Sequence, residues 1–307
     1  MTTPTLEQAL KDGWMPIREV ARRTGVNAVT LRAWERRYGL VVPHRTAKGH
    51  RLYDDGHVQH IQQILTWLNR GVAVSQVREL LDSAAVEPPS AAQNDWQLLA
   101  HGLLNAIGTL AERRVDEIFN QAMSLYPPAT LCEQLLLPLL QTLEQRWQGQ
   151  FGAQLERVFF YSWLRSKLGA RLYHNNRQLS GPPVLLVNQS SLPMEPHLWL
   201  SAWLISSADC PVEVFDWPLP QGELALAVDR LGARAVVLYA SQAMNLGQLA
   251  RLIGNCRCPK LIVGPAVRIH FDEWAVQAHD IEELSLADTP IAAQQRLQQL
   301  GLLQDRL

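Results

Sequence analysis

The sequence has little cysteine and no long hydrophobic run. Its 307 residues include only four cysteines, Cys132, Cys210, Cys256 and Cys258, and no two of them form a CxxC pair. Neither a disulfide framework nor a zinc ribbon is indicated, and a reducing, cytoplasmic location is expected. The first residues lack a basic start followed by an apolar core, and no later run approaches bilayer-spanning length. We therefore expect neither export nor membrane insertion.

Sequence motifs of the common enzyme classes are also missing. There is no nucleophile elbow, Walker loop or GxGxxG. Cys256 and Cys258 have no further Cys/His cluster nearby, so buried small residues are the better interpretation than a metal site. Five polar residues between positions 270 and 280 are interpreted as part of an ordinary loop and not as metal ligands or acid-base groups: His270, Asp272, Glu273, His279 and Asp280. The chain is not expected to be an enzyme or to bind a metal.

The charge is unevenly distributed along the chain, although its net value is only −1. Residues 1–83 hold 12 Lys and Arg against 8 Asp and Glu, which leaves 16 against 21 for residues 84–307. The segment from Met15 to Tyr53 contains nine Lys and Arg residues but only two acidic residues, Glu19 and Glu35. Such a cluster is typical of a surface that binds a polyanion, and a merely solvated basic face is the alternative.

The first domain is predicted over residues 15–83, after an N-terminal tail of residues 1–14. Residues 17–24 form a helix, Gly25 turns the chain, and Asn27 caps a second helix that runs to about Tyr38. Residues 43–53 then predict a basic hairpin, and two more helices follow from Asp54 and Ser75. This spacing is that of a winged helix-turn-helix.

The rest of the chain predicts two further domains. Residues 84–94 contain paired prolines and small residues and are interpreted as a linker. Residues 95–179 hold four segments with apolar residues every three or four positions, which predicts a four-helix bundle. Residues 180–307 alternate four short β-rich runs with helices and end in a helix, which predicts a Rossmann-like parallel α/β domain. The four runs are residues 184–187, 212–215, 235–239 and 261–263. Any ligand is then expected beyond the carboxyl ends of the strands.

The segment from Ile17 to Ile64 contains LRAWERRYGL followed by RT-x-x-GHRLY, and it resembles the MerR family of regulators. The resemblance implies promoter DNA as partner, with a recognition helix reading base edges and a wing holding the backbone. It covers about residues 15–83. The residues expected to contact DNA are Arg18, Thr30, Arg32, Arg36, Arg37, Tyr38, Arg45, Lys48, His50, Arg51 and Tyr53.

Residues 95–285 resemble, more weakly, the sensory half of the CarH/LitR/MlrA-like branch of that family. In that branch a helical cap and a Rossmann-like domain bind cobalamin through D-x-H-x-x-G. Here the stretch is Glu195-Pro196-His197-Leu198-Trp199-Leu200, so the histidine is kept and the aspartate and glycine are not. Leu200 fills the position where the cofactor tail would approach the backbone. The other counterparts are Trp147, Ser241 and Gly264, while Glu156-Arg157-Val158 replaces the Glu-His pair of the cap.

These observations predict a DNA-binding regulator whose degenerate cobalamin-type domain has lost its cofactor and serves oligomerisation and signal sensing. The resemblance implies a homo-oligomer, a dimer or tetramer, and light response through a protein partner such as a LOV-domain photoreceptor. The alternative is a direct, adenosylcobalamin-dependent light sensor. A cobalamin-dependent methyltransferase shares the cap-plus-Rossmann layout but has no reason to carry a winged helix.

Overall fold

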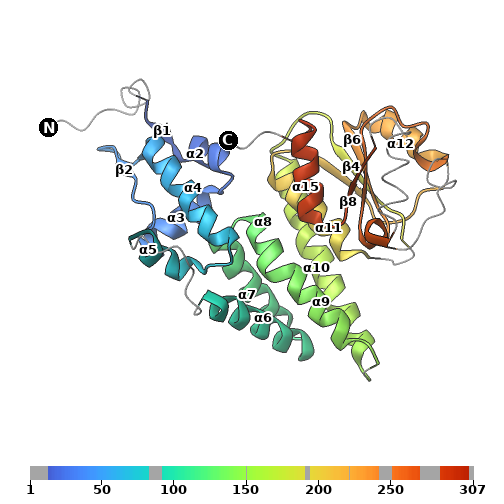
Figure 1. Cartoon of the computed structure of the whole chain (residues 1–307), viewed down its shortest axis with the longest axis horizontal. Helices are drawn as coiled ribbons and strands as arrows, with labels where there is room; N and C mark the ends of the chain where they lie inside the picture. The colour runs from blue at the N-terminus through green and yellow to red at the C-terminus, as the bar shows by residue number, and fades with distance from the viewer. Residues whose placement is uncertain are drawn as a thin grey trace. The chain divides into compact units, whose positions relative to one another are not determined.

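The computed structural model describes residues 13–82, 92–149, 151–190, 194–220, 222–241, 251–269 and 284–303. Contacts divide the chain into two compact units, Met1–Arg157 with Arg306–Leu307, and Val158–Asp305 (Figure 1). The division falls inside one helix instead of at residues 94 or 179. No helix of the described residues combines the length and apolar character needed to cross a membrane.

The winged helix-turn-helix is confirmed at the start of the first unit. Its elements are β1 (Met15–Pro16), α2 (Ile17–Thr24), α3 (Ala28–Ala33), the π-helical η1 (Trp34–Tyr38), β2 (His44–Arg45), β3 (Arg51–Tyr53), α4 (Asp55–Asn69) and α5 (Val74–Asp82). Gly25 ends α2 at φ 73°, a conformation that glycine adopts without strain. Asn27 caps α3 by accepting a 2.8 Å hydrogen bond from the Thr30 N–H. The two-residue β1, which pairs with β3, was not anticipated.

The predicted four helices follow. They are α6 (Ala92–Gly108), α7 (Glu112–Leu125), a run made of α8 (Pro128–Leu131), η2 (Cys132–Leu136) and α9 (Leu137–Arg146), and α10 (Ala153–Asn176). Ala92 already lies in α6, so the last residues of the predicted linker are helical. Apolar side chains of α7 such as Val115, Ile118 and Phe119 are buried, as their spacing predicts. The first three helical runs belong to the first unit, and α10 continues into the second.

The second unit is built on a parallel sheet, as predicted, and this sheet has five strands, one more than the sequence indicates. Its strands are β4 (Val184–Asn188), β5 (Val212–Phe215), β6 (Ala235–Tyr239), β7 (Lys260–Val263) and β8 (Leu284–Ala287), in the order β5-β4-β6-β7-β8. The other elements are α11 (Pro196–Ser207), α12 (Glu223–Leu231) and α15 (Pro290–Gln299). The order reverses direction at β4, so the gap between the ends of β4 and β6 is the switch point where such sheets bind ligands.

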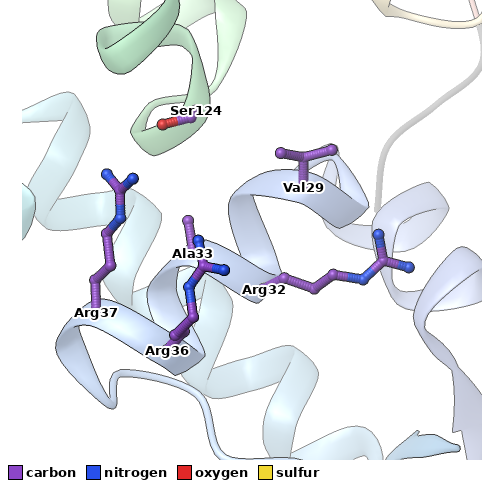
Figure 2. Close-up of a pocket in the computed structure, with 6 residues that line it drawn as sticks. All are labelled: Val29, Arg32, Ala33, Arg36, Arg37 and Ser124. Carbon is purple, nitrogen blue, oxygen red and sulfur yellow. The ribbon is translucent and has the colours of Figure 1, made fainter.

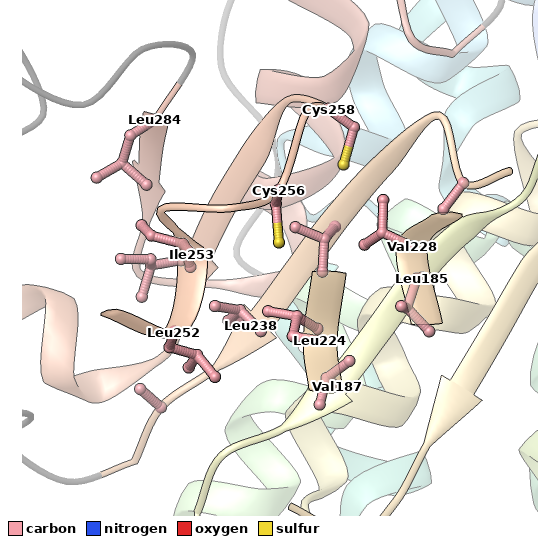
Figure 3. Close-up of a cluster of buried hydrophobic side chains, with 14 of the residues drawn as sticks. Leu185, Val187, Leu224, Val228, Leu238, Leu252, Ile253, Cys256, Cys258 and Leu284 are labelled. Carbon is pink, nitrogen blue, oxygen red and sulfur yellow. The ribbon is translucent and has the colours of Figure 1, made fainter. Parts of the chain in front are cut away.

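Apolar strand residues account for the core of this unit. Figure 3 shows Leu185, Val187 and Leu238 of the strands near Leu224 and Val228 of α12, all of them buried. Strands buried on both faces are expected to be apolar throughout, and β4 and β6 are buried at every position. Cys256 and Cys258 lie in the same cluster, as expected for small buried residues. The polar group at positions 270–280 lies outside the described residues.

Candidate nucleic-acid interface and strand-end site

The recognition helix, defined here as α3 with η1 (residues 28–38), exposes three of the predicted DNA-contacting arginines. Arg32, Arg36 and Arg37 are exposed, and within the described part of the chain no hydrogen bond or ion pair holds their guanidinium groups. Unpaired guanidinium groups are free to form forked hydrogen bonds with guanine or phosphate oxygens. Arg18, Lys48 and His50 are exposed as well.

Two wing arginines are instead tied to the recognition helix. Arg45 Nη2 lies 2.5 Å from Glu35 Oε1, and Arg51 Nε donates to Glu35 Oε2 at 2.6 Å. Burial opposes ionisation of Glu35, but the hydrogen bonds from Arg51 and Arg45 outweigh it and hold the pKa of Glu35 below its ordinary value. Glu35 thus positions the wing against the helix. Arg51 therefore has a structural partner besides any DNA contact.

Thr30 and Tyr53, which the sequence places among the DNA-contacting residues, are buried. Thr30 lies on the inward side of α3 with Leu31, and Tyr53 is packed in the core at the end of β3. Burial also raises the pKa of Tyr53 to about 12. Neither side chain is on the surface in this arrangement, which supports a packing role. Tyr38 is half-buried.

One exposed residue of the recognition helix was missed by the sequence argument. Val29 is 59% exposed on the first turn of α3, and it lies in line with Arg32, Ala33 and Arg36 at helical spacing. Figure 2 shows Arg36 and Arg37 extending toward the side on which Ser124 lies. An apolar side chain among arginines is suited to contact a thymine methyl group. Its spacing from the arginines could have revealed it.

His197, at the position of the family's cobalt ligand, is stacked on an aromatic ring. Its imidazole lies parallel to the ring of Tyr239 at the end of β6, with ring centroids 6.2 Å apart and planes within 9°. A Cβ on Gly264, which follows β7 at φ 121°, would meet the Ala240 carbonyl oxygen at 2.5 Å and the Tyr239 ring at 3.1 Å. The side of Gly264 on which a Cβ would lie is therefore already filled by protein, and it offers no slot for a cofactor tail.

Desolvation, with a smaller contribution from the positive charge of Arg268, lowers the pKa of His197 to about 4. The folded protein therefore favours the neutral imidazole. Because the unfolded chain binds this proton near pH 6.5, stability is present above that pH and is lost as the pH falls toward 4. We expect a loss of about 3 kcal/mol over this window. Urea unfolding of wild type and His197→Gln at pH 7 and pH 4.5 checks this, since the variant should lose less stability between the two.

The cap residues are also engaged within the protein. Trp147 is buried, and its indole Nε1 donates to Glu156 Oε2 at 3.3 Å. Arg146 holds the other oxygen of Glu156 at 2.8 Å. Glu156 is thus paired with a cation and an indole, while Val158, at the position of the missing histidine, is 63% exposed.

The other residues at the family's cofactor-binding positions differ in how deeply they are buried. Glu195 is buried at the start of α11, and Leu200, in place of the motif glycine, is fully buried in that helix. Ser241 is half-buried just after β6. The described residues hold no group of three or more His, Cys, Asp or Glu that could bind a metal ion. The observed packing of His197, Gly264 and Leu200 does not fit a bound cobalamin.

Comparisons with known proteins agree with this architecture. The family model for the MerR HTH family regulatory protein matches residues 15–84, and the model for the B12 binding domain matches residues 99–172. The HTH-type transcriptional regulator MlrA of Escherichia coli (strain K12) is 31% identical over 278 residues, 88% of this chain and 98% of the relative. The HTH-type transcriptional repressor CarH of Myxococcus xanthus is 31% identical over 165 residues, 50% of this chain and 54% of the relative.

A solved structure, the methanol:cobalamin methyltransferase complex MtaBC from Methanosarcina barkeri, covers 73% of this chain and 88% of its own. Its TM-score is 0.35 at 12% identity, which is too low to support any argument about function.

A winged helix-turn-helix with exposed arginines on its recognition helix defines a DNA-binding protein. The chain is also similar to MlrA over nearly the whole length of that protein. It belongs to the MerR family of helix-turn-helix transcriptional regulators. The region that matches the B12 binding domain is the helical one, α6 to α10.

Proposed function

We propose that this MerR-family regulator binds promoter DNA through its recognition helix and wing, and that its C-terminal domain works without cobalamin. The stacking of His197 on Tyr239 carries the second half of the proposal. A cobalt ligand must present one ring nitrogen to the metal with open space above it. Here the imidazole is largely desolvated beside Tyr239, and a Cβ added to Gly264 would come within 3.1 Å of the same ring.

Each of the two units supports the proposal separately. In the first unit, Glu156 is already bound by Arg146 and Trp147. In the second unit, Leu200 of α11 takes up the space that a glycine would leave. The signal is then expected from a protein partner, such as a LOV-domain photoreceptor, or from a small ligand at the strand ends. Self-association as a dimer or tetramer is part of the proposal, and light scattering of the full chain tests it.

Titration with adenosylcobalamin in the dark tests the cofactor-free mode. The purified protein is expected to be colourless and to show no change in the cobalamin spectrum at micromolar concentration. Its affinity for duplexes selected from a random-sequence pool should be the same in the dark and in the light. A bound-cobalamin spectrum that disappears in His197→Ala would overturn the proposal and support the direct light sensor.

A further inference from the structure

The winged domain does not stand free of the helical region in the first unit. In two places an indole donates a hydrogen bond across their boundary at 2.8 Å: Trp34 Nε1 to the Leu125 carbonyl oxygen, and Trp96 Nε1 to the Gly71 carbonyl oxygen. The first of these bonds ties the recognition helix to the C-terminal end of α7. Trp34 is completely buried, although it lies on the helix that must enter the major groove.

Two side-chain pairs extend the same contact. Thr130 Oγ1 donates to Asn69 Oδ1 at 2.8 Å, and Ser75 Oγ donates to Asp95 Oδ2 at 2.8 Å. Both pairs join the end of α4 or the start of α5 to the helical region. Two longer hydrogen bonds add to these four, from the Val74 N–H to the Tyr126 hydroxyl and from Gln134 Nε2 to the Asn69 carbonyl oxygen, both at 3.4 Å. All six have neutral donors, and each such bond contributes little net stability, so the interface can open.

The docked arrangement covers one side of the recognition helix. Val29, Arg36 and Arg37 line a cavity of about 200 Å³ whose opposite wall includes Ser124 of α7 (Figure 2). A recognition helix lies in a major groove about 12 Å wide, with a phosphate backbone along each side. Ser124 lies across this cavity from the arginines, and Leu125 beside it accepts the hydrogen bond from Trp34. The end of α7 therefore lies next to the recognition helix on this side.

We propose that the surface of α7 around Ser124 and Leu125 masks the recognition helix, and that specific DNA binding requires α3 to separate from α7. The inference builds on DNA binding by the winged domain and adds how that binding is controlled. If only a fraction of molecules is undocked, the apparent affinity for DNA falls by that fraction. Any event that shifts the helical region away from α3 then increases DNA binding without touching a DNA-contacting residue.

Weakening the docked state from the side of the helical region is the first test. Thr130→Val removes the donor to Asn69 and keeps the shape of the side chain, and Trp96→Phe removes the donor to Gly71. The double variant is expected to bind selected DNA at least threefold more tightly than wild type. Thr142→Val is the matched control, because the Thr142 hydroxyl bonds only within its own helix, to the Pro138 carbonyl. Unchanged or weaker binding by a folded double variant would contradict masking.

Locking the docked state is the second test. Ser75 and Asp95 lie in contact near the surface, so Ser75→Cys with Asp95→Cys can be bridged by a cleavable bis-maleimide. The four native cysteines are buried, which leaves the new pair as the reactive one. We expect at least a tenfold loss of specific DNA binding in the bridged protein and its return after cleavage, with both single-cysteine variants unaffected.

The two possible failures of the bridging experiment are distinguishable. A bridged protein that binds as tightly as the cleaved one would overturn masking while leaving DNA binding intact. A protein that binds selected DNA neither before bridging nor after cleavage would contradict DNA binding by the winged domain itself.

Discussion

Arg36→Ala is expected to weaken binding to selected DNA by about 1–3 kcal/mol, or roughly 5- to 150-fold, and to relax sequence preference at one position. The Arg36 side chain is exposed on the recognition helix and packs in no core, so the fold should be unaffected. Fluorescence anisotropy at fixed salt measures the loss. Arg114→Ala, at an exposed arginine of α7, is the control and should leave affinity unchanged.

A comparison with the wing separates base reading from backbone contact. Lys48→Ala should weaken binding to all sequences alike and lower the salt dependence of the affinity by about one counterion. Arg36→Ala should instead act mainly on the selected sequence. Equal affinity of Arg36→Ala and wild type for that sequence would remove Arg36 from the reading surface.

Arg51 is expected to behave differently from Arg36. Its guanidinium group bonds to Glu35, so Arg51→Ala disturbs the contact between the wing and the recognition helix as well as any phosphate contact. Arg45 still holds the other oxygen of Glu35 in that variant. This pairing between residues 16 positions apart has no local signature, which is why the sequence assigned Arg51 to DNA alone.

The sequence predicted elements well where local signals and burial agree. Asn27 and Asp54 cap the helices they were expected to cap, and the paired apolar strands β4 and β6 lie where their buried runs predict. It missed β8 (Leu284–Ala287), which has two leucines and no β-branched residue. A strand of that composition is determined by its neighbour β7 more than by its own propensity.

Burial of Trp34 illustrates the same limit at the candidate DNA surface. The residue lies on a helix whose motif and charge indicate DNA binding, and a motif cannot report which side of the helix another domain covers. The contact with α7 joins residues far apart in the sequence, such as Trp34 and Leu125. Only the fold shows it, because no spacing rule links these positions.

Gly264→Ala is expected to be strongly destabilising even though no cofactor is involved. The residue has φ 121°, and an added Cβ would lie 2.5 Å from the Ala240 carbonyl oxygen, which is backbone and cannot swing away. Backbone strain of about 1–3 kcal/mol adds to the cost of forcing apart the ends of β6 and β7, so a total of about 3–5 kcal/mol is expected. Thermal and urea unfolding measure this loss of stability.

Gly232→Ala in the same unit supplies the matched comparison. Gly232 also has positive φ, 57°, but its added Cβ would meet nothing within 4 Å, so only the conformational cost of about 1–2 kcal/mol applies. The difference between the two variants reports the contact with Ala240 and Tyr239 together with the less accessible backbone conformation at φ 121°. If Gly264 were kept only to let a cofactor tail approach, its alanine variant without cofactor would lose no more than the conformational cost. A clearly larger loss at Gly264 instead means that this glycine, like His197 beside Tyr239, serves the packing of the strand ends.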